Sequence, residues 1–153
     1  MSKEKSLTDF LREKKERDEE QGGEVDWEAI KDKYLADLEA LYGQIEDWLK
    51  TPISDGVVAP TRDKTVLKEE HVGQYNAESL VLTVGRSSVR FRPVGAVIVG
   101  AKGRVDVLSG RQSVMLILGM EGGWHFARRR PNLTTWPLTQ ESFEDLLRDF
   151  LAE

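Results

Sequence analysis

The sequence predicts an α+β fold, in which a long N-terminal amphipathic helix precedes a largely antiparallel, strongly bent sheet of five to seven short strands and a C-terminal helix. Three observations support this prediction. Apolar residues recur at helical spacing over residues 26–50, the period changes to two from Thr65 onward, and helical spacing returns after Thr139. The 153 residues suit one domain that buries a sizeable core.

Residues 1–24 form a charged segment that we separate from a single α+β domain over residues 25–153. Ser6 can cap a helix whose first turn carries Leu7, Phe10 and Leu11, and a run without an apolar face follows. An isolated helix of this length is marginal in water, so we expect a flexible arm or a short helix. The alternative is a short motif that docks into a groove on another protein or another copy.

Residues 26–50 carry the clearest helical pattern. Asp26 is a candidate N-cap, and Pro52 should prevent the helix from continuing. The apolar stripe consists of Trp27, Ile30, Tyr34, Leu38, Leu41, Ile45 and Trp48. We expect this stripe, including both tryptophans, to pack against the sheet as core, with helix pairing in a dimer as the alternative.

The middle of the chain alternates between apolar and polar residues after a predicted loop over residues 51–63. Candidate strands lie near 65–69, 79–84, 88–92, 94–99, 103–108, 113–119 and 124–128, and Trp124 should face the core. The connections are too short to hold crossover helices, so the sheet should be an antiparallel meander. Pro93 cannot donate a ladder hydrogen bond and should mark a bulge, a bend or an edge.

The chain closes with a well-specified helix. Thr139 is the candidate N-cap, and Leu138 and Phe143 occupy the positions of a hydrophobic staple. The expected apolar face consists of Phe143, Leu146, Leu147, Phe150 and Leu151.

The run from Ser113 to Leu118 is apolar on both strand faces, so it should be covered on both sides, by a helix on each face or by a curled half-barrel. A bent sheet of about seven strands followed by a C-terminal helix is similar in outline to pleckstrin-homology-like domains. This resemblance concerns layout alone and implies no function.

The charged residues are sorted into blocks. The whole chain carries −5, while residues 1–78 carry −8, residues 79–138 carry +7 and residues 139–153 carry −4. Either the acidic flanks fold onto the basic middle and neutralise it, or the middle faces an anionic partner.

Strand alternation predicts where the basic side chains point. Arg90 and Arg92 should share one face while Val89 and Phe91 share the other, and Arg104 should lie beside Asp106. Arginine binds carboxylates and phosphates bidentately. We therefore predict a non-enzymatic binding module whose basic sheet and loop surface binds an acidic protein or another copy of the chain. The expected partner-binding residues are Arg90, Arg92, Arg104, Arg128, Arg129, Arg130 and Trp136.

Trp136 has two interpretations, because a loop tryptophan beside arginines is typical of a binding hot spot and also of a packed loop anchor. A solvated or internally neutralised arginine surface is the alternative to the whole binding hypothesis.

Nucleic-acid binding through the basic segment 86–130 is a second functional alternative. The residues Gly100-Ala-Lys-Gly103 resemble the GXXG loop of KH domains, which would imply contact with a nucleotide backbone. Both flanks are β-like rather than helical, which favours a hairpin turn. The net charge of −5 also argues against strong nonspecific DNA binding.

A small hydrolase-type enzyme is the third alternative. His71 could pair with Glu70, and His125 could meet Asp106 across strands. Neither histidine has metal-ligand spacing, the catalytic and nucleotide-binding glycine motifs are absent, and there is no cysteine. We therefore expect no enzyme activity, no metal and no cofactor.

The sequence predicts neither a secretory signal nor a membrane span. The first residues lack the apolar region of a secretory signal, and no run of 18 apolar residues occurs. We expect a cytoplasmic protein with no membrane span, and possible homodimerisation.

Overall fold

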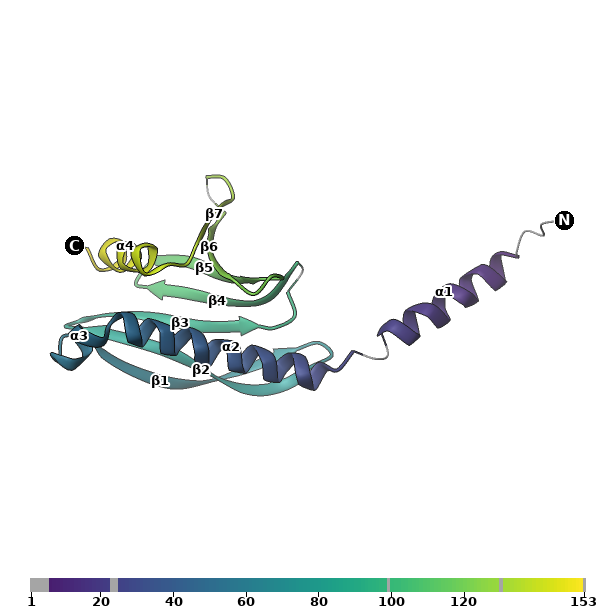
Figure 1. Cartoon of the computed structure of the whole chain (residues 1–153), viewed down its shortest axis with the longest axis horizontal. Helices are drawn as coiled ribbons and strands as arrows, with labels where there is room; N and C mark the ends of the chain where they lie inside the picture. The colour runs from purple at the N-terminus through teal and green to yellow at the C-terminus, as the bar shows by residue number, and fades with distance from the viewer. Residues whose placement is uncertain (1–5, 23–24, 99, 130, 153) are drawn as a thin grey trace.

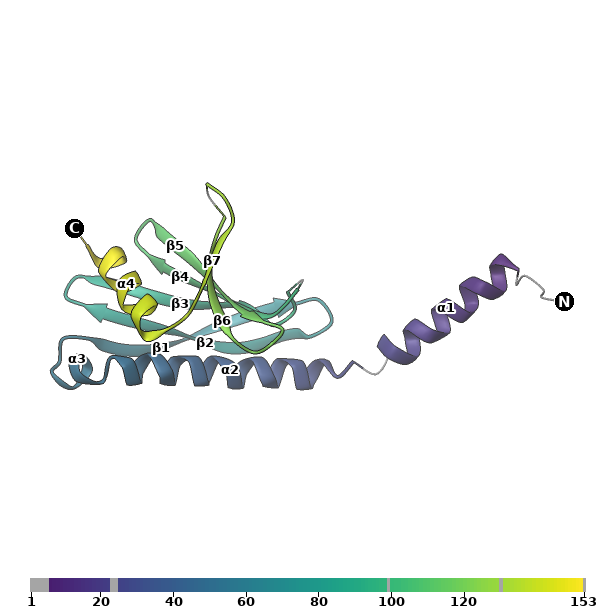
Figure 2. The same ribbon diagram turned by 45° about the horizontal axis from the view of Figure 1, so that its top comes forward.

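The computed structural model describes residues 6–22, 25–98, 100–129 and 131–152, and it confirms the α+β class. A long helix, α2 (Trp27–Trp48), lies along one face of a seven-stranded antiparallel sheet, and α4 (Gln140–Leu151) covers the same face near the C-terminus (Figures 1 and 2). The sheet is bent but not closed, so its first and last strands are edges.

Helix α2 begins and packs as its sequence predicts. The Asp26 carboxylate accepts a hydrogen bond from the Ala29 N–H at 3.0 Å, which caps the first turn. The buried residues are Tyr34, Leu38, Leu41, Tyr42 and Ile45. Trp48 is half-buried against the core, as predicted. Trp27 was also expected in the core but lies outside it, and its ring stacks on that of His71 with the ring centres 4.9 Å apart.

The expected loop over residues 51–63 was wrong in two places. Residues Lys50–Ser54 form a short helix, α3, and the first strand already begins at Ala59. Pro52 lies in the first turn of α3, where the N–H that proline lacks has no intrahelical partner. Pro52 therefore permits a new helix although α2 ends before it.

The seven strands follow one another in the sheet in chain order. They are β1 (Ala59–Glu69), β2 (Gly73–Val84), β3 (Ser87–Gly95), β4 (Ala101–Ser109), β5 (Gln112–Gly119), β6 (Trp124–Arg128) and β7 (Thr134–Pro137). The meander was predicted, but β7 was not. The expected strand over 94–99 was also wrong, because β3 continues through Pro93 with a register irregularity between Pro93 and Gly95.

The long hairpin of β1 and β2 separates from β3 over half of its length. Strand β2 pairs with β3 only between Leu80 and Val84, although it pairs with β1 from Gly73 to Thr83. The Tyr42 hydroxyl lies at the fork and donates toward the carbonyls of Glu78 (2.7 Å) and Phe91 (3.3 Å). This side chain therefore satisfies polar backbone that the sheet leaves unpaired.

The tip of the same hairpin is attached to the end of β3 through Glu69. The Glu69 carboxylate accepts hydrogen bonds from the backbone N–H groups of Ala96 (3.0 Å) and Val97 (2.9 Å), and from the Tyr75 hydroxyl. A Cβ on Gly95 would lie 2.5 Å from the Glu69 carboxylate. Gly95 thus allows the carboxylate to approach the backbone.

The core fills the space between the sheet and the two helices. Phe91, Val107, Leu116 and Phe126 lie on the inner face, and each is fully buried. Thr139 caps α4 as predicted, and Ser142 completes a capping box with it. Phe143 packs on the rings of Phe91 and Trp48, which joins α4 to both the sheet and α2.

The outer face of β5 differs from the expectation that the run 113–118 is covered on both sides. Val114, Leu116 and Leu118 are buried on the inner face, while Met115 and Ile117 are half-buried on the outer face. In the described part of the chain, no helix covers this outer face, which is the face that carries the arginines described below.

Residues Leu7–Gly22 form helix α1, which extends away from the sheet in both ribbon views (Figures 1 and 2). The Ser6 hydroxyl accepts a hydrogen bond from the Asp9 N–H at 3.2 Å, as a helix cap. Leu7, Phe10 and Leu11 are all exposed.

Candidate functional site: an arginine-rich sheet face

Strand alternation places three of the predicted binding residues on the outer face of the sheet. Arg90 and Arg92 alternate with buried Val89 and Phe91 along β3, and Arg104 follows the same pattern on β4. In the β3–β4 register, Arg92 lies directly opposite Asp106. Arg129, which follows β6, borders the groove on this same face. We call Arg90, Arg92, Arg104 and Arg129 the arginine face.

One carboxylate lies at the centre of this face and contacts two arginines. Asp106 accepts from Arg104 at 2.9 Å through Nε, and from Arg92 at 3.4 Å through Nη2. The Asp106 side chain is only 14% exposed, whereas that of Arg92 is 49% exposed. Arg90 pairs with Asp63 of β1 at 2.9 Å. Two aspartates therefore oppose four guanidinium groups, and the face retains a positive charge.

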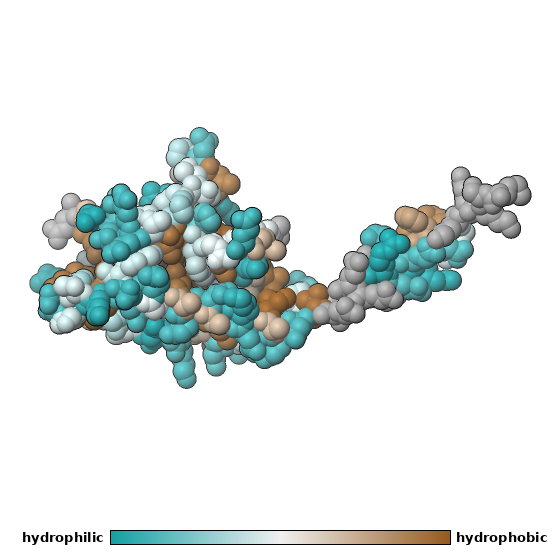
Figure 3. All heavy atoms as spheres, in the orientation of Figure 1, coloured by the Kyte–Doolittle hydropathy of each residue, from teal (hydrophilic) through white to brown (hydrophobic). Residues whose placement is uncertain are grey.

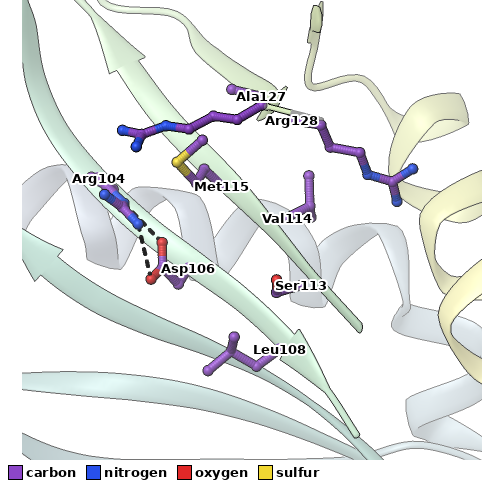
Figure 4. Close-up of a pocket in the computed structure, with 9 residues that line it drawn as sticks. Arg104, Asp106, Leu108, Ser113, Val114, Met115, Ala127 and Arg128 are labelled. Atoms are coloured by element: carbon purple, nitrogen blue, oxygen red, sulfur yellow. Dashed lines mark hydrogen bonds and ion pairs between the residues drawn. The ribbon is translucent and has the colours of Figure 1, made fainter. Parts of the chain in front are cut away.

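A groove of about 410 Å³ runs along the arginine face over β4, β5 and the end of β6. Leu108, Met115 and Ala127 line its apolar part, and Arg104, Asp106 and Arg129 line its charged part. Figure 4 shows Arg104 and Asp106 pointing toward each other, with Met115 beside them and α2 behind the sheet. The groove offers both charged and apolar side chains on one surface.

Arg128 also borders this groove, but its guanidinium belongs with Trp136 to a different cluster. Arg128 lies one residue from Arg129 but extends toward α4, where it pairs with Asp149 at 3.6 Å (Figure 4). Its guanidinium carbon is 5.8 Å from the centre of the Trp136 ring, and that ring packs on Phe126 at 5.5 Å. Trp136 is therefore a half-buried residue of β7, not a loop residue, and it packs against the core.

The predicted set of seven residues is thus divided. Arg90, Arg92, Arg104 and Arg129 share the outer face, and Arg128 and Trp136 lie beside α4. Arg130 lies outside the described residues.

The acidic flanks neutralise only part of the basic middle. Asp149 of α4 pairs with Arg128, but the acidic residues of α2 pair elsewhere. Glu39 and Glu46 of α2 pair with Arg62 of β1, at 2.9 and 2.8 Å. Aspartates on strands, Asp63 and Asp106, are the acidic partners of the arginine face.

The histidines lie in separate surroundings. His71 occupies the turn between β1 and β2 with a φ of 66°, stacks on Trp27 and stands 4.0 Å from Glu70. His125 is exposed, and its Nδ1 lies 3.3 Å from the Gly123 carbonyl. Asp106, the carboxylate expected beside His125, pairs with Arg104 and Arg92 instead.

The glycine-containing loop that resembles the KH motif joins two strands. Ala101 N–H donates to the Ile98 carbonyl at 3.2 Å, and Gly100 has a φ of 76° in this turn between β3 and β4. The structure therefore agrees with the hairpin interpretation, because a helix flanks neither side of the loop.

Two features of the site were missed in the sequence. Asp63 was assigned to a loop, so its pairing with Arg90 could not be anticipated from alternation within β3 alone. Met115 lies between buried Val114 and Leu116, and the same alternation that placed the arginines could have placed it on their face.

Comparisons with protein-family models, curated proteins and solved structures found no match to this chain. Within the described ranges, no helix combines the length and the apolar character needed to cross a bilayer. Among the same residues, no three or more His, Asp or Glu side chains are arranged to hold a metal ion.

Proposed function

We propose that this chain is a non-enzymatic binding module whose arginine face binds an acidic segment of a partner protein. The observation that supports it is the convergence of Arg90, Arg92, Arg104 and Arg129 on one face with only two aspartates among them. A face with surplus guanidinium groups attracts carboxylates and forms bidentate hydrogen bonds with them.

The chemistry of the groove favours a peptide over a bare anion. Each guanidinium has five N–H donors, so the bonds to Asp106 leave donors for a ligand. Leu108 and Met115 supply apolar contacts beside these donors, and methionine adapts to ligand side chains of different shapes. The expected ligand is an acidic stretch that also carries an apolar side chain.

Asp106 has a specific role in this proposal. It holds Arg104 in place and offsets charge that would otherwise attract anions more strongly. Arg128 and Trp136 are assigned to holding α4 against the sheet, because Arg128 already pairs with Asp149.

The test is binding of a fluorescently labelled octaglutamate peptide to the full chain, followed by anisotropy at low and high salt. We expect affinity to fall by about tenfold or more between about 0.05 and 0.5 M salt, since exposed pairs are screened over about 8–10 Å at physiological salt. Arg92→Gln with Arg104→Gln should weaken binding at low salt by about tenfold or more. Arg148→Gln on α4 is the matched control and should have little effect, because Arg148 pairs with Asp145 away from the arginine face.

Asp106→Asn provides the opposite change. Removing this carboxylate frees two guanidinium groups, so peptide affinity should rise. Unchanged affinity in the double arginine variant, or salt-independent binding, would rule out the arginine face as the binding surface. A single-stranded oligonucleotide tested in parallel that binds more tightly than the peptide would favour the nucleic-acid alternative.

A further inference from the structure

We propose that helix α1 docks its apolar face into a groove on a second copy of this chain, and that two copies exchange these helices reciprocally. This inference does not depend on the proposed function of the arginine face. Its two parts are an exposed apolar helix face and an exposed apolar groove, both carried by every copy.

The apolar face of α1 consists of Leu7, Phe10 and Leu11, which are 72%, 56% and 52% exposed. Their spacing places them on one side of the helix. The rest of α1 is strongly polar, so this side has no apolar continuation toward Gly22. Figure 3 shows hydrophobic residues on α1 as a cluster apart from the main body of the molecule. A short helix with such anchors is the form that grooves on other proteins recognise.

The groove lies at the end of the domain where α2 begins. Trp27, Ile30 and Tyr34 of α2 form one wall, and Val97 and Ile98 of the β3–β4 connection form the other, with Met120 beside them. Its volume is about 450 Å³ and its lining is predominantly apolar. Val97 and Met120 are 43% and 62% exposed, which leaves apolar surface open to solvent. Figure 3 shows hydrophobic residues gathered at this end of the domain.

The length of α1 argues against docking into the groove of the same chain. With a rise of about 1.5 Å per residue, a fold-back that sets Gly22 level with Trp27 places Leu11 level with Leu38. The groove ends at Asp37, so the three apolar residues would pass beyond it. They would instead lie level with Leu38 and Tyr42, where the groove beside α2 is smaller, about 280 Å³, and is bordered by the charged residues Glu39, Lys64 and Glu78. The α1 helix of a second copy is not tied to this α2, so its apolar residues can reach the groove.

The charges at the two surfaces are compatible. Asp9 and Arg12 flank Phe10 on α1, and the groove is rimmed by Lys33, Asp37 and Lys102. Both surfaces therefore carry the two signs of charge around an apolar centre, as interfaces with a polar rim do. Reciprocal exchange also produces a closed two-fold dimer, in which helix α1 of each copy, here called the arm, occupies the groove of the other copy.

Sedimentation velocity of the full chain across a concentration series tests this proposal. We expect a monomer–dimer equilibrium with a Kd between about 1 and 100 μM, as befits a small interface. Phe10→Glu should weaken dimerisation by about tenfold or more, and Val97→Glu or Met120→Glu should do the same from the groove side. Leu133→Glu is the matched control, because it places the same charge on an exposed apolar residue that lies in neither surface.

Mixing an arm variant with a groove variant distinguishes the exchange of α1 helices from other modes of dimerisation. The Phe10→Glu chain keeps its groove and the Val97→Glu chain keeps its arm, so an equimolar mixture should recover a heterodimer with one arm–groove contact. A monomeric wild type at all concentrations, a dimer unaffected by Phe10→Glu, or no recovery on mixing would each overturn the proposal. Circular dichroism and thermal melting of every variant verify that it is folded.

Salt distinguishes this dimer from association through the arginine face. Apolar contacts are not screened, so the arm-exchanged dimer should persist at about 0.5 M salt. A dimer that dissociates with added salt would contradict arm exchange, whatever the result of the peptide experiment.

Discussion

At the scale of single residues, a glycine and a tyrosine fix where α2 meets the sheet. Tyr34 donates its hydroxyl to the Arg104 carbonyl at 2.6 Å, and its ring lies over Gly103. A Cβ at residue 103 would come within 2.6 Å of the Tyr34 ring, a distance that real side chains do not tolerate. Gly103 is therefore required by packing, although its motif resembles a nucleotide-binding loop.

Two glycine-to-alanine substitutions should have opposite effects on stability. Gly103→Ala forces Tyr34 away from the sheet and should destabilise the fold by about 1–3 kcal/mol. Gly43→Ala on α2 meets no atom within 4 Å and should stabilise it by about 0.5–1 kcal/mol, because alanine favours the helix. Urea denaturation monitored by tryptophan fluorescence measures both. A neutral Gly103→Ala would show that the Tyr34 contact is dispensable.

At the scale of elements, Arg62 joins α2 to the first hairpin. Its guanidinium lies 4.9 Å from the centre of the Tyr42 ring and contacts Glu39, Glu46 and Glu78. Burial lowers the pKa of Arg62, but hydrogen bonds to Glu39 and Glu46 outweigh it and hold the pKa above its ordinary value. One cation on β1 is thus shared by three carboxylates, two from α2 and one from β2.

Arg62→Met should destabilise the fold by roughly 1–3 kcal/mol at pH 7 and by less at pH 4.5. The apolar stem is retained, but the three carboxylates lose the cation between them and repel one another in the folded state. Protonation of carboxylates removes such repulsion, so the loss of stability should be smaller at the lower pH. Urea denaturation at the two pH values, with Arg148→Met as control, measures the difference. An equal loss at both would mean that the carboxylates do not interact.

Local signals explain which elements could be predicted. Asp26 and Thr139 are caps beside strongly periodic apolar residues, so α2 and α4 were predicted to within a few residues. Strand β7 and the start of β1 were not, because β7 has four residues and Pro60 interrupts the start of β1. Their pairing with neighbouring strands, which is not local information, makes them strands.

The same limit applies to the candidate site. Alternation placed Arg90, Arg92 and Arg104 correctly on one face. Alternation along the expected strand 124–128 also puts Arg128 on the face of Trp124, but it could not show that Asp149 of α4 would be the partner of Arg128. Contacts between distant elements decide such positions.

At the scale of the whole molecule, two tyrosines of α2 connect the helix to three strands. Tyr34 reaches β4, and Tyr42 reaches β2 and β3, with both rings almost fully buried. Burial raises the pKa of each hydroxyl above its ordinary value. Protonated tyrosines are therefore a condition of the folded state.

This condition predicts how stability changes in alkali. Below the unfolded pKa of about 10, both hydroxyls are protonated in either state and the stabilisation is complete. As pH rises above about 10, the unfolded chain loses these protons first, and stability should fall by about 1.4 kcal/mol per pH unit for each tyrosine. Urea denaturation from pH 8 to pH 11 measures how steeply the free energy of unfolding falls with pH. This fall should be less steep for Tyr42→Phe than for the wild type. The same slope in both chains would mean that Tyr42 ionises as readily in the folded state.

The open sheet has a further consequence for how copies of this chain can aggregate. An exposed edge strand is a template for amyloid-like growth, yet both edges here are unsuitable for it. Strand β1 carries Pro60, Lys64 and Lys68, and β7 is four residues long and ends at Pro137. Proline removes a backbone donor, and the charges of stacked lysines repel. The edges should therefore resist fibril formation at high protein concentration, although the sheet never closes.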